Sequence, residues 1–340
     1  MQPLADREQE WTLADKVAAL GRRDFYPEGT AAVTCTETHM SWVFLTDQHA
    51  YKLKKPVRYE YLDFSTPDLR RFNCEEEIRL NRRLAPNVYL GVVPLTAGAG
   101  GQLELGGPGS AVDWLVKMRR LPAAGMLDAA IAARTLRADG IARIAALLAD
   151  FYAGAPHIDL DAGTYCKRFE REIALNRAEL PRYGLLQDEI EAPLRGQAAF
   201  LRGQRGVLEQ RAHERRILEG HGDLRPEHVY IGPPAMVIDC LEFNAALRLV
   251  DPVDEIGYLA MECERFGAPA IGECVLAAYA ARTGDRPSAA LLHFYMSLRA
   301  CVRARLAIWH LRDEMVADRA KWIERARDYL RHALRHAEAI

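Results

Sequence analysis

The spacing of apolar residues changes near Pro122, and this change limits the possible fold more than any other feature of the sequence. Between residues 31 and 118, β-rich runs such as SWVFLTD and VYLGVVPL alternate with turns, and one helical pattern covers 66–84. Beyond Pro122, helical spacing dominates at 134–152, 162–180, 192–218, 253–266, 268–281, 289–311 and 315–339. The sequence HVYIGPPAMVID interrupts these helices with two short strands. We therefore predict an α+β chain: a small antiparallel sheet with one helix, then a larger, mainly helical part with an embedded β-hairpin.

Charge and cysteine content exclude several classes of protein. The 340 residues contain 45 Lys and Arg against 47 Asp and Glu, a formal charge of −2, which does not favour nucleic acid as a partner. Seven scattered cysteines without a C-x-x-C pair are not the pattern of a disulfide framework or a zinc site. Acidic residues in the first ten positions oppose a signal peptide, and no apolar run approaches the ~18 residues of a membrane span. We therefore expect a cytoplasmic protein with no membrane partner.

Polar residues are densest in HGDLRPEHV, at positions 221–229, and VID follows at 237–239 across the predicted hairpin. Such a pattern indicates a loop that holds charged groups on a rigid support. Asp223 and Asp239 would then converge at the ends of the hairpin. One carboxylate can accept a proton from an attacking hydroxyl while the other holds a divalent cation, and phosphoryl transfer needs both functions.

These motifs carry a resemblance to a known family. HGDLRPEHV followed by VIDCLEFN resembles the H-G-D-L-x-x-x-N and I-D motifs of the aminoglycoside phosphotransferase and choline kinase-like family, which has the protein-kinase-like fold. With YKLKKPV, EEEIRLNRRLAPNVYLGVVPL and VKMRRLP, the chain resembles the branch often fused to a P-loop ATPase domain. No G-x-x-x-x-G-K-[ST] motif occurs, so we expect that domain to be absent. The resemblance implies a nucleotide-binding lobe over 1–118 and a helical lobe with the catalytic loop and acceptor site over 119–340.

The resemblance also implies roles for three residues of the helical lobe. Asp223 resembles the catalytic aspartate that orients and deprotonates the acceptor hydroxyl, and Asp239 resembles the aspartate that holds Mg²⁺. His228 stands where the family usually has a metal-binding asparagine, and imidazole is a poorer Mg²⁺ ligand than an amide oxygen. His228 is nevertheless a candidate metal ligand as well as a candidate catalytic residue, and three other roles remain open: it binds phosphate, it leaves the site with one metal only, or it positions Asp223 through a hydrogen bond.

In the amino-terminal lobe the resemblance implies a lysine that binds the phosphates of ATP and a glutamate that holds it. Alternation along the strand favours Lys52, with Lys54 two residues further on the same face as the alternative. Spacing within the following helix favours Glu77 as the partner, with Glu76 as the alternative. Adjacent glutamates on a helix point in different directions, so at most one or two of them can face the lysine.

Further nucleotide contacts follow from the same resemblance. Thr38 and Ser41 flank the turn that corresponds to the phosphate-covering loop, but the glycine-rich motif is missing, so an ordinary hairpin turn is an equal alternative. Met118 lies in the connector that would offer backbone groups to adenine.

Charged residues further along the chain have two interpretations each. Glu242 lies close to Asp239 in sequence and would face the acceptor or a second metal. Arg299 and Arg303 share one helix face and would bind an anionic acceptor, or pair with Glu262 or Glu264, which we favour.

The leading functional prediction is an enzyme: a phosphotransferase that uses ATP and Mg²⁺ to phosphorylate a hydroxyl of a small molecule. Aminoglycosides are not favoured as acceptors, because several arginines occur in the helices expected to line the site. Two alternatives remain. One is a nucleotide-binding pseudokinase or regulatory module, suggested by His228 and the missing glycine-rich loop. The other is a kinase or nucleotidyltransferase that modifies a protein.

Overall fold

The computed structural model describes residues 11–59, 62–98, 100–185, 187–312, 316 and 318–340. Its contacts group the chain into two compact units: unit 1 comprises Met1–Ala123 and Val237–Ala245, and unit 2 comprises Ala124–Met236 and Ala246–Ile340. The acidic residues that oppose a signal peptide precede residue 11 and lie outside the described residues.

The two units differ from the predicted division into 1–118 and 119–340 at two places: unit 1 extends to Ala123, and Val237–Ala245 packs with unit 1. Backbone hydrogen bonds explain this placement: the amide of Asp239 donates to Tyr89 Oη at 3.0 Å, and that of Cys240 donates to Asn81 Oδ1 at 2.8 Å. These partners are 150 and 159 residues apart along the chain, so local sequence patterns do not reveal the return of the segment.

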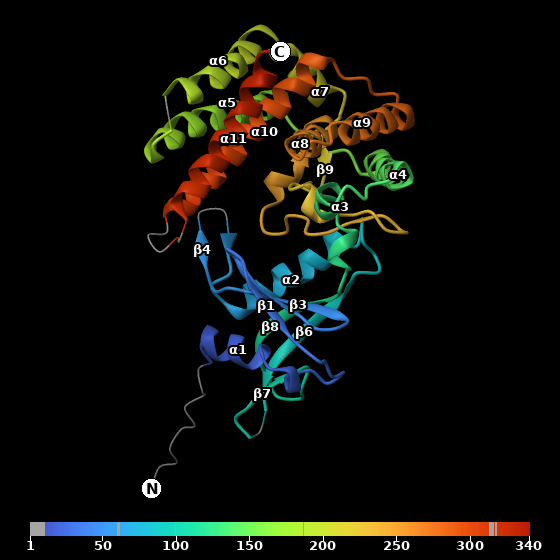
Figure 1. Cartoon of the computed structure of the whole chain (residues 1–340), viewed down its shortest axis with the longest axis vertical. Coiled ribbons are helices and arrows are strands. Elements are labelled where there is room, and N and C mark those ends of the chain that lie inside the picture. Colours follow the sequence, from blue (N-terminus) through green and yellow to red (C-terminus); the bar gives the residue numbers. More distant parts are fainter. Residues whose placement is uncertain (1–10, 60–61, 99, 186, 313–315, 317) are drawn as a thin grey trace. The chain divides into compact units, whose positions relative to one another are not determined.

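Unit 1 is built on a six-stranded antiparallel sheet with the strand order β1-β2-β3-β8-β6-β7 (Figure 1). The strands are β1 (Thr34–Glu37), β2 (Ser41–Leu45), β3 (His49–Lys54), β6 (Tyr89–Ala97), β7 (Leu103–Leu105) and β8 (Ser110–Arg119). A separate two-stranded sheet pairs β4 (Arg58–Tyr59) with β5 (Leu62–Asp63). The predicted small antiparallel sheet is therefore confirmed.

Alternation along β3 points its side chains to two faces of the sheet. Tyr51 and Leu53 are fully buried in an apolar core together with residues of α1 (Leu13–Leu20). Lys52 and Lys54 point to the opposite face, where α2 packs on β6 and β8. The strand therefore brings two cations to the helix that covers this face.

Helix α2 (Pro67–Asn81) occupies most of the predicted 66–84. Thr66 is its N-cap, and the Thr66 hydroxyl accepts a hydrogen bond from the amide of Leu69. Pro67 follows in the first turn, where its missing N–H costs nothing. These signals fix the start of the helix, and its packing on β6 and β8 turns Glu77 toward the sheet.

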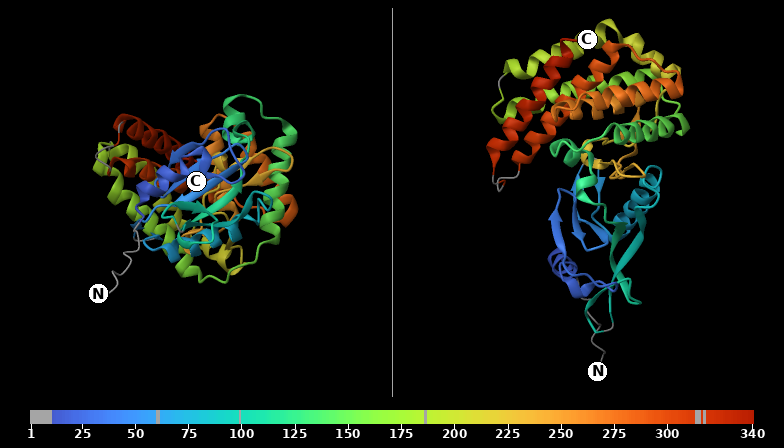
Figure 2. Two further views of the ribbon diagram at one scale, coloured as in Figure 1. Left: turned by 90° about the horizontal axis from the view of Figure 1, so that it is seen from below. Right: turned by 45° about the vertical axis from the view of Figure 1, so that its right-hand side comes forward.

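Unit 2 is mainly helical, as predicted. Its helices are α3 (Leu127–Ala132), α4 (Ala138–Gly154), α5 (Ala162–Glu179), α6 (Gln187–Gly203), α7 (Arg205–His213), α8 (Pro252–Arg265), α9 (Ala270–Thr283), α10 (Ala289–Trp309) and α11 (Arg319–Ala337). Residues 252–263 of α8 are all buried, so this helix forms the centre of the unit. Helix α10 packs against α8 and runs beside α11, drawn in orange and red in Figure 2.

Short strands complete the unit. The two strands of the predicted hairpin are present as β10 (Val229–Tyr230) and β11 (Met236–Val237). The sequence pattern did not reveal β9 (Leu218–Glu219), which pairs antiparallel with β12 (Leu249–Val250). Two-residue strands are too short for a visible alternation, so only their distant pairing defines them.

Some predicted helix limits are wrong. Helix α4 begins at Ala138 rather than 134, because Arg134 follows α3 with a left-handed φ of 54°. The predicted helix over 192–218 is divided into α6 and α7 by Gln204, whose φ and ψ of −129° and 23° are not helical. The predicted start of the last helix at 315 lies outside the described residues. None of the described helices combines the length and apolar character needed to cross a bilayer.

Candidate active site

A cluster of buried charges in unit 1 joins the two lysines of β3 to α2. Glu77 is fully buried, with Lys52 Nζ 3.0 Å from its Oε1 and Lys54 Nζ 2.6 Å from its Oε2. Lys52 Nζ also lies 2.8 Å from Asp239 Oδ1, while Lys54 contacts Glu242. The predicted ion pair between Lys52 and Glu77 is therefore present, and Glu77 serves Lys54 as well.

The alternative glutamate faces elsewhere. Both carboxylate oxygens of Glu76 accept hydrogen bonds from Arg79 at 2.8 Å, on the exposed side of α2. Glu77, one position further, points into the sheet, so one step along the helix separates a surface pair from a buried one. Glu242, for which the acceptor or a second metal was expected, pairs with Lys54.

Mutual electrostatics keep this cluster ionised. Burial opposes ionisation of Glu77, but the charges of Lys52 and Lys54 outweigh it and lower the pKa of the carboxyl. Burial likewise opposes the charge on Lys52, yet Asp239 and Glu77 raise the pKa of its ammonium well above the usual value. At neutral pH, therefore, Lys52 is an ammonium directed between two carboxylates.

Asp239 is the most accessible member of the cluster. Its side chain is 46% exposed, whereas that of Lys52 is 14% exposed. Its φ of 62° is left-handed, a conformation that costs about 1–3 kcal/mol for a residue other than glycine and is concentrated at functional sites. The bond from its amide to Tyr89 Oη holds it there. A carboxylate supported in this way is a suitable oxygen ligand for a hard divalent cation.

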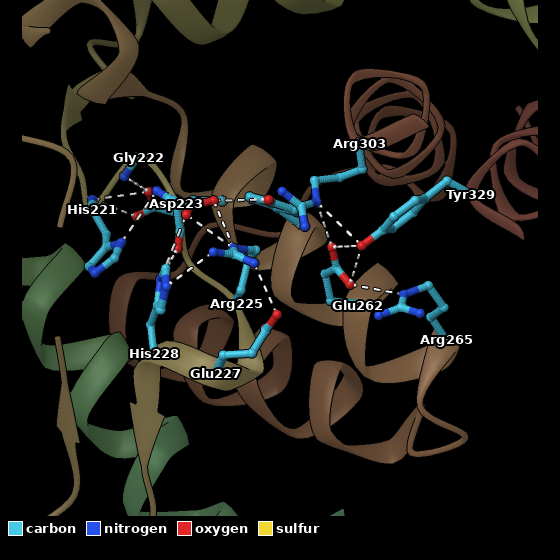
Figure 3. Close-up of polar contacts among 12 residues, drawn as sticks. His221, Gly222, Asp223, Arg225, Glu227, His228, Glu262, Arg265, Arg303 and Tyr329 are labelled. Atoms are coloured by element: carbon cyan, nitrogen blue, oxygen red, sulfur yellow. Dashed lines mark hydrogen bonds and ion pairs between the residues drawn. The ribbon is translucent and has the colours of Figure 1, made fainter. Parts of the chain in front are cut away.

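In unit 2, Asp223 lies within a network of polar side chains (Figure 3). Arg225 Nε is 3.0 Å from both carboxylate oxygens of Asp223, and Tyr258 Oη donates to Oδ1 at 3.0 Å. Burial opposes ionisation of Asp223, but positive charge nearby, above all that of Arg225, outweighs it and lowers the pKa of the carboxyl. Asp223 is therefore a carboxylate at neutral pH, as a proton acceptor must be.

His228 has both ring nitrogens engaged within the same loop. Nδ1 lies 2.8 Å from the carbonyl oxygen of Asp223, and Nε2 lies 3.1 Å from Nη2 of Arg225. A carbonyl only accepts and a guanidinium only donates, so Nδ1 carries the proton and Nε2 uses its lone pair on Arg225. This arrangement corresponds to the third role considered for His228, in which it orients the loop around Asp223.

The backbone of this loop is anchored by a buried carboxylate that the sequence motifs did not single out. Glu255, 1% exposed, accepts hydrogen bonds from the amides of His221 and Gly222 and, at 2.9 Å, from Tyr152 Oη. Gly222 has a φ of 88°, which glycine adopts without strain. Burial raises the pKa of Glu255, while the two amides oppose that rise. The sequence signal was slight: an acidic residue in the first turn of a helix.

Two arginines of α10 were predicted to pair with Glu262 or Glu264; the prediction is confirmed for Arg303 and wrong for Arg299. Arg303 Nε lies 3.1 Å from Glu262 Oε1, the pairing that the sequence favoured. Arg299 instead makes two hydrogen bonds of 2.7 Å to Asp254, in the first turn of α8. Both Glu262 and Asp254 lie on α8, and helical periodicity alone does not determine which carboxylate faces which arginine.

The remaining predicted nucleotide contacts lie in unit 1. The Thr38 hydroxyl accepts a hydrogen bond from the amide of Ser41 at 3.0 Å, and Ser41 is buried, as in an ordinary hairpin turn. Met118 is half-buried in β8 opposite Ala50 of β3. A nucleotide contact from Thr38, Ser41 or Met118 stays a prediction.

Known proteins show what this fold resembles. No protein-family model matches the chain. Uncharacterized proteins of Mycobacterium bovis and Mycobacterium tuberculosis are 32% identical over 307 residues, which is 87% of this chain and 59% of theirs. The chain thus spans less than two thirds of the length of these curated relatives.

Solved structures share the fold at low sequence identity. A choline/ethanolamine kinase family protein from Mesorhizobium loti has a TM-score of 0.55 and 14% identity, over 95% of this chain and 98% of its own. The GDP complex of aminoglycoside 2′-phosphotransferase-IIIa has a TM-score of 0.50 and 14% identity, over 94% of this chain and 98% of its own. A glucosamine kinase has a TM-score of 0.50 and 15% identity, over 92% of this chain and 79% of its own. The chain has the fold of these kinases and phosphotransferases, which confirms the predicted resemblance at the level of the fold.

Proposed function

We propose that this protein is a phosphotransferase that uses ATP and Mg²⁺ to phosphorylate a hydroxyl group of a small molecule. The observation that carries the proposal is the position of Lys52, whose ammonium contacts both Glu77 and Asp239. Phosphoryl transfer in this fold uses a lysine held by a helix glutamate beside a metal-binding aspartate. The relatives matched by sequence are uncharacterized, so the proposal depends on this geometry and on the shared fold.

Within unit 1, each group of the cluster has a distinct function in the proposal. Lys52 donates to phosphate oxygens of ATP, and Glu77 keeps its ammonium oriented. Asp239, which is half exposed, holds Mg²⁺, and the metal neutralises the charge of the phosphates. Lys54 is fully buried between Glu77 and Glu242, so we assign it to the stability of the cluster and not to the nucleotide.

Within unit 2, Asp223 accepts the proton of the attacking hydroxyl. Its low pKa ensures that it is ionised, and Tyr258 and Arg225 fix its orientation. We assign His228 to positioning Asp223 and Arg225, because its Nε2 lone pair faces Arg225. His228 as a metal ligand is thus the less supported of the roles predicted from the sequence.

The acceptor we favour is not polycationic. The structural neighbours are named for choline, ethanolamine, aminoglycoside or glucosamine, which are statements about those proteins. In this chain, the charges of Arg225 and Arg303 act directly on Asp223. Two guanidinium groups next to the proton acceptor disfavour a substrate with several positive charges.

The decisive test is turnover of ATP with a panel of sugars, amino alcohols, nucleosides and antibiotics, selected first by thermal shift in the presence of Mg-ATP. We expect one acceptor class to stimulate turnover and Asp223→Asn to reduce kcat by about 10²–10⁴-fold with ATP binding retained. Asp239→Asn should instead weaken Mg²⁺-dependent ATP binding. Asp159→Asn, at an exposed position of unit 2, is the matched control.

Other outcomes would assign a different function. Absence of turnover with every acceptor, together with Mg²⁺-independent ATP binding, would support the pseudokinase alternative and contradict the proposal. Mass spectrometry of candidate partner proteins after incubation with ATP distinguishes the protein-directed alternatives, because a small-molecule kinase leaves them unmodified.

A further inference from the structure

Two histidines that have no part in the candidate active site lie in the buried face of the last helix. His332 and His336 of α11 are only 7% and 3% exposed. They are four positions apart, so their side chains lie one turn apart on the same face of the helix. The other buried residues of this helix are apolar or small except Tyr329, whose hydroxyl donates to Glu262. Buried imidazoles in such a face require partners for their nitrogens.

A carboxylate from another helix completes the group. Glu264, in the last turn of α8, places Oε2 3.1 Å from His336 Nε2. One ligand atom from each of Glu264, His332 and His336 lies within 4.8 Å of the other two. Two imidazole nitrogens and one carboxylate oxygen are thus close enough together to share one cation.

Hydrogen bonding among the described residues leaves one of these ring nitrogens without a partner. His332 Nδ1 is buried and has no hydrogen-bond partner in the described part of the chain. His336 Nε2 is also buried, and the carboxylate of Glu264, 3.1 Å away, pairs with it as an ion only when the ring is protonated. An unpartnered polar atom in a side chain that is nine-tenths buried costs about 1–3 kcal/mol, unless a ligand satisfies it.

A third histidine sets the orientation of His336. His293 of α10 places its Nδ1 3.0 Å from Nδ1 of His336, and the two rings stack at 26°. One of the two nitrogens donates and the other accepts. If His336 donates, its Nε2 carries a lone pair directed toward the carboxylate, and a cation between them removes the repulsion. This is the tautomer that a partner of a metal-bound histidine normally selects.

We propose that Glu264, His332 and His336 form a binding site for a divalent transition-metal ion, with Zn²⁺ as the preferred ion. Imidazole nitrogen and carboxylate oxygen are ordinary zinc ligands, and a water molecule completes four-coordination. His293 is a positioning residue that binds His336 and not the metal. The absence of paired cysteines from the sequence does not bear on this site, because it uses none.

The site would connect two helices that are distant in sequence. Glu264 ends α8, and the two histidines lie in the last turns of α11. A metal ion that binds only the folded state stabilises that state by mass action. We therefore expect metal to stabilise the contact between α8 and α11. This site is separate from the proposed Mg²⁺ ligand, since Asp239 belongs to unit 1 and these residues to unit 2.

The test is a titration of metal-free full-length protein with Co²⁺, and in parallel with Zn²⁺ by equilibrium dialysis, without nucleotide. We expect one Co²⁺ per chain, visible absorption bands typical of tetrahedral coordination, and a Zn²⁺-dependent rise in Tm. His332→Gln and Glu264→Gln should each abolish the bands and the Tm shift. His293→Ala should weaken binding by about 10–100-fold without changing the shape of the spectrum.

His213→Gln, at an exposed position of α7, is the control and should bind as the wild type does. Circular dichroism verifies the fold of each variant, and Glu264→Gln, at a half-buried position, serves if His332→Gln does not fold. The exposed thiols of Cys35 and Cys274 can also bind metal, but they are the same in every variant. The difference in metal binding between variants therefore measures the proposed site. Wild type that binds no metal, or variants that bind it equally well, would overturn the proposal.

Discussion

The charged clusters of the two units differ in how far apart their partners lie along the chain. In unit 1, Lys52 contacts Glu77 and Asp239, which are 25 and 187 residues away. In unit 2, Asp223 is bound mainly by Arg225, two residues away, and by Tyr258, 35 residues away. The first cluster therefore exists only when strand, helix and returning segment are all packed, whereas the second is largely formed by its own loop. Loss of a shared partner should be far more costly in unit 1.

The largest expected effect is that of Glu77→Ala on stability. This change leaves the buried ammonium groups of Lys52 and Lys54 without their common partner, and breaking a buried ion pair costs about 3–5 kcal/mol. Urea denaturation measures the loss. The matched control is Glu76→Ala, which removes a surface pair with Arg79 and should cost less than about 1 kcal/mol. Equal losses in the two variants would show that unit 1 does not depend on the shared carboxylate.

The next comparison separates the two lysines. Lys52→Met should weaken Mg-ATP binding by about 1.5–3 kcal/mol, the contribution of a hydrogen bond to a charged group. Lys54→Met should lower the free energy of unfolding and leave the affinity of the folded protein almost unchanged, because Lys54 is fully buried between carboxylates. Isothermal calorimetry measures the affinity and urea denaturation the stability. The reverse pattern would exchange their assigned roles.

A smaller effect is expected in unit 2 from Glu255→Gln. The amide group of glutamine would face the N–H donors of His221 and Gly222, so at least one donor loses its acceptor at a cost of about 1–3 kcal/mol. Turnover should also fall, because the loop that carries Asp223 is no longer held. Glu273→Gln, at an exposed position of α9, is the control for the same substitution. An unchanged stability would mean that the loop holds itself without Glu255.

The smallest and most discriminating effect is the opposite pH dependence of the two glutamates. The lysines lower the pKa of Glu77 in the folded protein. Its carboxylate therefore adds to the free energy of unfolding above about pH 4.5, and this stabilisation is lost as the pH falls through the pKa of the folded state. Burial raises the pKa of Glu255 in the folded protein. Its contribution to the free energy of unfolding is therefore present below about pH 4.5 and is lost as the pH rises through the pKa of the folded state.

Urea denaturation between pH 3 and pH 7 tests this difference. Relative to the wild type, the destabilisation of Glu77→Gln should shrink as the pH falls, and that of Glu255→Gln should shrink as the pH rises. Parallel curves for both variants would remove the electrostatic distinction between the two units.

The sequence was sufficient to predict residues that belong to local motifs. The β-rich character and the helix of unit 1 and the helical character of unit 2 follow from periodicity, whereas the pair Lys52 and Glu77 follows from the family resemblance together with spacing. Sequence reasoning missed Glu255 and Tyr258, because neither belongs to a motif and both reach the catalytic loop from a helix more than 30 residues away. It placed Arg299 on the wrong carboxylate for the same reason.

By itself, the sequence determined which chemical groups this protein can use: a lysine-bearing strand, glutamates on a helix, and two aspartates on either side of a short hairpin. Side-chain periodicity is a local property, so it can be read without the fold. Only the tertiary structure decided that Glu77 serves both lysines, that His228 faces Arg225, and that Val237–Ala245 packs with the sheet. These outcomes depend on which partner satisfies each buried charge, and burial is a property of the whole packed chain.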